Sequence, residues 1–202
     1  LSPAELIRIC KMLEVCSRVK AYSRRENYVV EQDALDVMFS VLQPLTPLAS
    51  EIRRCMPSED EIADDASPTL KSIRRAMHQM NDKIHAQLAA MVNGSARTYL
   101  QDAVITMRNG RYCLPVKAEH RSQVAGMIHD QSSTGSTIFI EPMAVIKLNN
   151  ELRELELKEE KEIEVILADL SSKAAAQQEA LTGDLEILTQ LDFIFARAQL
   201  SR

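Results

Sequence analysis

Four basic side chains lie close together in the middle of the chain, and a phosphate group is what such side chains bind best. They are Arg108, Arg111, Lys117 and Arg121. Between residues 103 and 128 they are opposed by one acidic side chain, although the whole chain has a net charge of −5. A local excess of cations is typical of contact with a nucleic-acid backbone, but hairpins also keep basic residues at their edges. We expect these four residues to bind nucleic acid, with an ordinary solvated hairpin as the alternative.

Two other groups could suggest an enzyme, and the sequence favours neither of them. His129 and Asp130, with Glu141 nearby, resemble part of a hydrolytic site, but no motif places a Ser or Cys nucleophile beside them. The segment 132–137 is rich in Ser, Thr and Gly, as phosphate-binding loops are. No Gly in the chain precedes a Lys, however, so a Walker A motif is absent. We expect no catalytic residue and no cofactor within this chain, and in particular no bound ATP.

The acidic, histidine and cysteine side chains are not spaced as metal ligands usually are. Residues 151–164 contain seven acidic and three basic side chains that are spread around a helix, which is typical of a solvated helix face. His78 and His85 share a helix face, and we expect them to be exposed and without a function. The four cysteines show no C-x-x-C spacing, and reduced thiols suit a cytoplasmic protein. We therefore expect no metal site.

A β-hairpin must position the first two arginines. Apolar and polar residues alternate over 103–108 and 111–116, and the dipeptide between them, Asn109-Gly110, is the strongest short signal for a type I′ turn. This turn places Arg108 opposite Arg111 on a solvent-exposed face that also carries Cys113, while the other face belongs to the core. Like charges in opposite positions destabilise a hairpin unless an anion lies between them, and phosphate is the natural anion.

A second hairpin is predicted over 124–131 and 136–141, so 103–141 forms a small, four-stranded sheet that is too small to be stable alone. Helical periodicity surrounds it. A capped helix begins at Ser2-Pro3, shorter helices cover 33–42 and 48–56, and a long helix covers 68–93. From Met143 helical periodicity continues to the end of the chain and is interrupted only at Thr182-Gly183.

Composition agrees with a fold that is mainly α with a small inserted antiparallel β-sheet. Of 202 residues, 46% are apolar and 4% aromatic, and five Gly and seven Pro are too few for an all-β protein. No apolar run approaches the roughly 18 residues that cross a bilayer, so no membrane contact is expected.

Several segments together resemble one family. They are 108–119 (RNGRYCLPVKAE), 126–135 (GMIHDQSSTG), 139–142 (FIEP), 148–155 (LNNELREL) and 191–196 (LDFIFA). These segments resemble the middle region of bacterial MutS-like proteins of type two, the paralogues that carry a C-terminal Smr nuclease domain. The resemblance runs over nearly the whole chain.

This resemblance implies a core, lever and clamp. Residues 1–66 would form a helical core, 67–101 an outgoing lever helix, 102–142 a β clamp, and 143–202 the returning lever helix and further core. The ATPase and Smr nuclease domains, with ATP and magnesium, would lie outside the chain, whose first residue is not Met and whose last residues continue a helical pattern. Family members are homodimers that bind branched DNA to suppress homologous recombination, or bind collided ribosomes and split them. Either role would place the four basic residues on a DNA or ribosomal RNA backbone.

Two other functions remain open at this point. The chain could be a structural coiled-coil arm that binds protein partners, because apolar residues advance by three or four along 70–91. It could also be an enzyme in its own right, which the lack of catalytic motifs makes the weakest reading. Ionic strength distinguishes nucleic-acid binding from the coiled-coil arm, because phosphate binding weakens steeply as salt rises and apolar helix packing does not.

Overall fold

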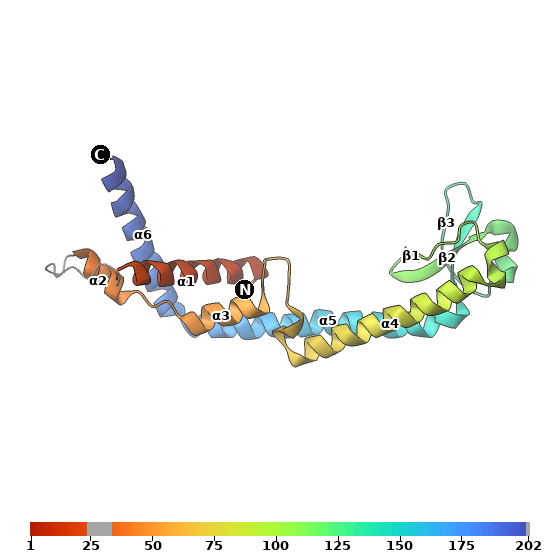
Figure 1. Ribbon diagram of the computed structural model, residues 1–202, viewed down its shortest axis with the longest axis horizontal. Helices are drawn as coiled ribbons and strands as arrows, with labels where there is room; N and C mark the ends of the chain where they lie inside the picture. Colours follow the sequence, from red (N-terminus) through yellow and green to blue (C-terminus); the bar gives the residue numbers. More distant parts are fainter. Residues whose placement is uncertain (24–33, 201–202) are drawn as a thin grey trace. The chain divides into compact units, whose positions relative to one another are not determined.

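A computed structural model describes residues 1–23 and 34–200 of the chain (Figure 1). The chain divides into two compact units. The helical unit comprises Leu1–Pro68 and Glu162–Arg202, and the sheet unit comprises Thr69–Lys161. In the part of the chain that the structure describes, no helix is long and apolar enough to cross a membrane.

The helical unit is built from short and medium helices. They are α1 (Pro3–Ser23), α2 (Ala34–Val41), α3 (Thr46–Cys55), the 3-10 turn η1 (Asp64–Ala66), the end of α5 (Met143–Ala175), and α6 (Gln178–Leu200). The predicted start of α1 is confirmed: Glu5 N–H donates to the Ser2 hydroxyl at 3.3 Å, and Ser2 N–H donates to the Glu5 carboxylate at 2.7 Å. This reciprocal capping box satisfies two backbone donors. The shorter helices lie where they were predicted, except that Asp33 lies outside the described residues.

Apolar side chains from α1, α3 and α5, and from the positions just after α2 and α3, are buried. Fully buried members include Leu6, Leu13, Leu42, Ile52, Met56 and Leu170. Each such side chain contributes roughly 1.5–3 kcal/mol when it leaves water. All four cysteines of the chain are buried as well, and all four are free thiols.

The sheet unit combines a four-stranded sheet with two long helices. Its elements are most of α4 (Pro68–Asn93), η2 (Ser95–Tyr99), β1 (Thr106–Arg108), β2 (Arg111–Lys117), η3 (Ala118–Gln123), β3 (Gly126–Gln131), β4 (Thr137–Pro142) and the first part of α5. The strands are antiparallel in the order β1-β2-β4-β3. The prediction of a mainly helical chain with two hairpins in a four-stranded antiparallel sheet is therefore confirmed.

One face of the sheet packs on the helices. The core between the sheet and the helices includes Leu114, Val116, Ile138 and Ile140 from the strands, Ile84, Leu88 and Val92 from α4, and Val145 and Leu152 from α5. An ion pair between Arg74 and Glu159, 2.7 Å long, joins α4 to α5 where the two helices run side by side (Figure 1). The helices thus supply the apolar cover that a sheet of this size needs.

The structure corrects one expectation about the last helix. The helix is interrupted at Ala176 and Gln177, whereas the predicted interruption, Thr182-Gly183, lies within α6. At the break, Gln177 N–H donates to the Ala174 carbonyl at 3.0 Å, a 3-10 contact in place of the α-helical one. No Gly or Pro stands at the break, so tertiary packing sets its position.

Candidate nucleic-acid interface

The turn between β1 and β2 has the predicted geometry. Asn109 and Gly110 have φ values of 52° and 71°, and Arg108 is the register partner of Arg111. Positive φ at both central residues is the signature of a type I′ turn. The Asn109 amide also donates to the His129 carbonyl at 3.1 Å, which ties the turn to β3.

Arg111 does not face solvent, and the sequence-based expectation is wrong on this point. Its side chain is 17% exposed, and Nη2 lies 2.6 Å from Oε1 of Glu141, whose side chain is fully buried. Arg111 Nε donates to the other carboxylate oxygen at 3.2 Å. The positive charge of Arg111 is therefore neutralised inside the protein, and no external anion is needed to separate it from Arg108.

Glu141 is the centre of a polar network. Besides Arg111, it accepts a hydrogen bond from Asn149 Nδ2 at 2.7 Å, and His129 Nε2 lies 2.6 Å from Oε2. Burial raises the pKa of Glu141, but the hydrogen bonds from Arg111, Asn149 and His129 outweigh burial and hold the pKa below its usual value. The network joins strands β2, β3 and β4 to helix α5.

The expected exposure of Cys113 is also wrong, because this thiol is fully buried. Burial, followed by the nearby carboxylate of Glu141, raises the pKa of Cys113 to about 11. A protonated, buried thiol is a poor nucleophile. The contact of His129 with Glu141 and the buried, protonated Cys113 therefore favour a structural network over a hydrolytic site.

Arg108, unlike Arg111, remains partly exposed beside Phe139 and Asp130. Its guanidinium carbon lies 3.9 Å from the centre of the Phe139 ring, and its Nε lies 3.2 Å from Asp130 Oδ2. The side chain is 37% exposed. The guanidinium thus lies over the ring with Nε on Asp130, and part of its surface is open to an incoming ligand.

Lys117 and Arg121 lie at the opposite end of the sheet from the turn. Arg111 and Lys117 begin and end the seven-residue strand β2, so they are on the order of 20 Å apart. Arg121 is exposed on η3, and Lys117 is half-buried. Within residues 1–23 and 34–200, no carboxylate lies within ion-pair distance of either cation.

A loop rich in hydroxyl groups lies beside Lys117. Lys117 is the register partner of Thr137, and Ala118 N–H donates to the Ser136 carbonyl at 2.9 Å. The hydroxyls of Thr134 and Ser136 are 2.9 Å apart, and Gly135 adopts a φ of 74°. Serine and threonine hydroxyls are common donors to phosphate oxygens. We refer to Lys117, Arg121 and residues 132–136 as the loop end.

The structure therefore separates the four predicted residues. Arg108 and Arg111 lie at the turn, Lys117 and Arg121 at the loop end, and only Arg111 is neutralised in a buried pair. The sequence did not include the segment 132–137 among the expected nucleic-acid contacts, because a Walker A motif is absent. No local signal could have included it, because the loop reaches Lys117 only through the pairing of β2 with β4, residues 137–140.

Comparison with known proteins gives a consistent result. No family model matches the chain. The chain is 60% identical over its whole length to Endonuclease MutS2 of Agathobacter rectalis and 56% identical to that of Lachnospira eligens. Over 94% of its length it is 44% identical to Endonuclease MutS2 of Symbiobacterium thermophilum. It spans about a quarter of the length of these relatives, 24–26%. The resemblance predicted from the motifs is thus confirmed, and the chain belongs to the MutS2 family.

Proposed function

We propose that the chain is the nucleic-acid clamp and lever region of a dimeric MutS-type ATPase. In this proposal the four-stranded sheet is the clamp, and α4 and α5 are the lever helices that carry it. Arg108, Lys117 and Arg121 contact the sugar-phosphate backbone, and Arg111 holds the sheet together. The name of the relatives, Endonuclease MutS2, supports the general class.

One observation carries the choice of contact residues. Lys117 and Arg121 have no carboxylate partner in the described chain, whereas Arg111 is bound to Glu141 and Arg108 to Asp130. A phosphate that binds Lys117 and Arg121 breaks no existing ion pair. The Ser and Thr hydroxyls of the loop end add neutral donors beside these charges. Such a surface suits a backbone rather than base edges, because it combines cations and hydroxyls.

The ligand in this proposal is branched DNA, in suppression of homologous recombination, or ribosomal RNA, in the splitting of collided ribosomes. Backbone contacts carry no base sequence information, so the loop end suits both. ATP with magnesium, the nuclease activity and the homodimer contacts would come from parts of the protein other than this chain.

The alternative of a coiled-coil arm for protein partners loses its main support. The apolar seam of α4 was its basis, and Ile84 and Leu88 of that seam are buried in the core of the sheet unit. These side chains are therefore unavailable to a separate partner helix.

The test removes both unpaired cations. We expect Lys117→Ala with Arg121→Ala to weaken binding to a fluorescein-labelled four-way DNA junction, measured by fluorescence anisotropy over a series of salt concentrations. The slope of log affinity against log salt should shrink by roughly 1.8, because each duplex phosphate contact contributes about 0.9. An RNA hairpin as a second ligand compares the two classes of nucleic acid.

The matched control replaces two exposed cations of α4, Lys71→Ala with Arg75→Ala, which changes the net charge equally. The control should keep the salt slope of the unmodified chain. If both double variants lose affinity equally, binding reflects overall charge and the loop end is not the contact surface.

A further inference from the structure

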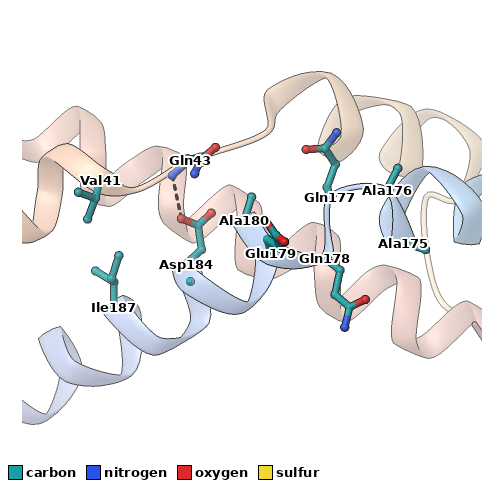
Figure 2. Close-up of a pocket in the computed structure, with 11 residues that line it drawn as sticks. Val41, Gln43, Ala175, Ala176, Gln177, Gln178, Glu179, Ala180, Asp184 and Ile187 are labelled. Atoms are coloured by element: carbon teal, nitrogen blue, oxygen red, sulfur yellow. Dashed lines mark hydrogen bonds between the residues drawn. The ribbon is translucent and has the colours of Figure 1, made fainter.

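A pocket within the helical unit has no part in the proposed nucleic-acid contact. It lies where α5 gives way to α6, and residues 41 and 43 close its other side (Figure 2). Its volume is about 790 Å³, within the roughly 300–1,000 Å³ typical of small-molecule sites. The break between α5 and α6 creates this pocket, because Ala176 and Gln177 at the break line it.

The walls of the pocket combine acidic and apolar side chains. Asp184 and Glu179 supply carboxylates, and Val41 and Ile187 supply apolar surface. None of the eleven described lining residues is basic. The pocket therefore suits a ligand that joins a positive charge to an aliphatic stem.

Asp184 is the unusual group in this wall. It is 2% exposed, and its Oδ1 accepts a hydrogen bond from the Gln43 backbone N–H at 2.8 Å. Figure 2 shows the carboxylate of Asp184 pointing from α6 toward Gln43. The other oxygen, Oδ2, is buried and has no hydrogen-bond partner among the described residues. A buried acceptor without a partner destabilises the fold, so a donor that reaches it is favoured.

Cys16 is a further neighbour of Asp184. The Cys16 thiol lies close enough to interact with this carboxylate, and burial, followed by Asp184, raises the pKa of Cys16 to about 12. The thiol therefore stays protonated and neutral, and an S–H group is a weak donor. It does not balance the negative charge.

We propose that this pocket binds a primary ammonium group on a short aliphatic stem, with the ammonium donating to Asp184 and the stem lying against Val41 and Ile187. An ammonium has three donors, so it can serve Oδ2 and the rim carboxylate of Glu179 together. Because Oδ2 is buried, a small rotation of the Asp184 side chain accompanies binding. A free diamine or a lysine side chain of a peptide would supply the same chemistry.

Isothermal titration calorimetry of the 202-residue chain tests the proposal with 1,5-diaminopentane. We expect saturable heat from the diamine and none from 1,5-pentanediol, which has the same stem without the charges. Asp184→Asn should weaken diamine binding at least tenfold, because the amide keeps an acceptor for Gln43 N–H but removes the charge. Asp102→Asn, the same substitution in the sheet unit, should change nothing. Nα-acetyl-lysine methylamide as a second titrant distinguishes a peptide source from a free amine.

Circular dichroism shows whether Asp184→Asn still folds. If it does not, Glu179→Gln at the exposed rim takes its place and must weaken binding while Asp102→Asn does not. The proposal is overturned if neither amine gives saturable heat. It is equally overturned if the variants at Asp184 and Glu179 both bind the diamine as tightly as the unmodified chain.

Discussion

Arg111 and Glu141 form a two-pronged ion pair in which both carboxylate oxygens accept a hydrogen bond, at 2.6 and 3.2 Å. The same guanidinium donates to the Asn150 side chain on α5 at 2.7 Å. Glu141 belongs to β4 and Arg111 to β2, so one arginine fastens two neighbouring strands to the helix that follows them. Its position beside the exposed turn therefore serves the geometry of the sheet.

Arg111→Ala should destabilise the sheet unit by roughly 3–5 kcal/mol, because it leaves the buried carboxylate of Glu141 without its cation. Urea unfolding measures the loss, and hydrogen exchange in β2 and β4 locates it. Arg153→Ala is the control, since Arg153 is exposed and pairs with Glu156 on the same helix face. That control should leave the unfolding midpoint unchanged. Equal midpoints for both variants would show that the Arg111 pair adds nothing to stability.

Acid should weaken the same network. The folded-state pKa of Glu141 is lowered from its usual 4.5, so the unfolded chain takes up this proton first as pH falls. The stability that Glu141 contributes is therefore complete above about pH 4.5 and is lost as pH falls through the lower, folded-state pKa. Glu141→Gln removes this titration. The difference in unfolding free energy between the unmodified chain and Glu141→Gln should shrink as pH falls below about 4.5. A constant difference down to pH 3 would contradict the assignment.

Local patterns were sufficient to predict much of the sheet unit. Alternation around Asn109-Gly110 correctly placed Arg108 opposite Arg111, because a two-residue turn fixes register within a few residues. The partner of Arg111 was beyond such reasoning. Glu141 lies 30 residues further along the chain, and the contact depends on β4, rather than β3, lying beside β2. Strand order is a property of the whole sheet, and no short motif encodes it.

In the helical unit, too, the sequence predicted local structure but not long-range contacts. Caps and prolines predicted where α1 and α3 lie, but the break at Ala176 and Gln177 has no helix-breaking residue. The break brings Asp184 under the chain at Gln43, a contact between residues 141 apart in sequence. Sequence periodicity therefore predicted the helices and missed the pocket that their junction creates.

The positive φ of Gly110 should make the turn sensitive to a side chain. A Cβ at Gly110 would meet no atom within 4 Å, so the effect of Gly110→Val is confined to backbone strain. The left-handed conformation costs a residue with a Cβ roughly 1–2 kcal/mol, and a β-branched residue lies at the upper end. We expect faster hydrogen exchange in β1 and β2 with no change in the helical unit.

Gly183→Ala, in α6 with open space around it, should instead stabilise the chain by about 0.5–1 kcal/mol.

Because Arg108 is paired with Asp130, we predict that substitutions at these two residues change nucleic-acid affinity in opposite directions. Asp130 places a negative charge 3.2 Å from the guanidinium, and both side chains are partly exposed. It would compete with a phosphate for Arg108 and repel the backbone. Asp130→Asn should therefore raise affinity for the DNA junction, whereas Arg108→Ala should lower it and reduce the salt slope by about 0.9.

The two substitutions together separate a direct contact from a general charge effect. If Arg108 binds phosphate, most of the gain from Asp130→Asn passes through the freed guanidinium and should disappear in the Arg108→Ala background. If overall charge alone governs affinity, Asp130→Asn should give the same gain in both backgrounds, because the two effects would then be independent. Anisotropy titrations of the four proteins at one salt concentration measure the coupling. Stability should change little, since a half-exposed pair of this kind contributes on the order of 0–1 kcal/mol. A gain that is equal with and without Arg108 would remove this residue from the proposed interface and leave Lys117 and Arg121 as its cations.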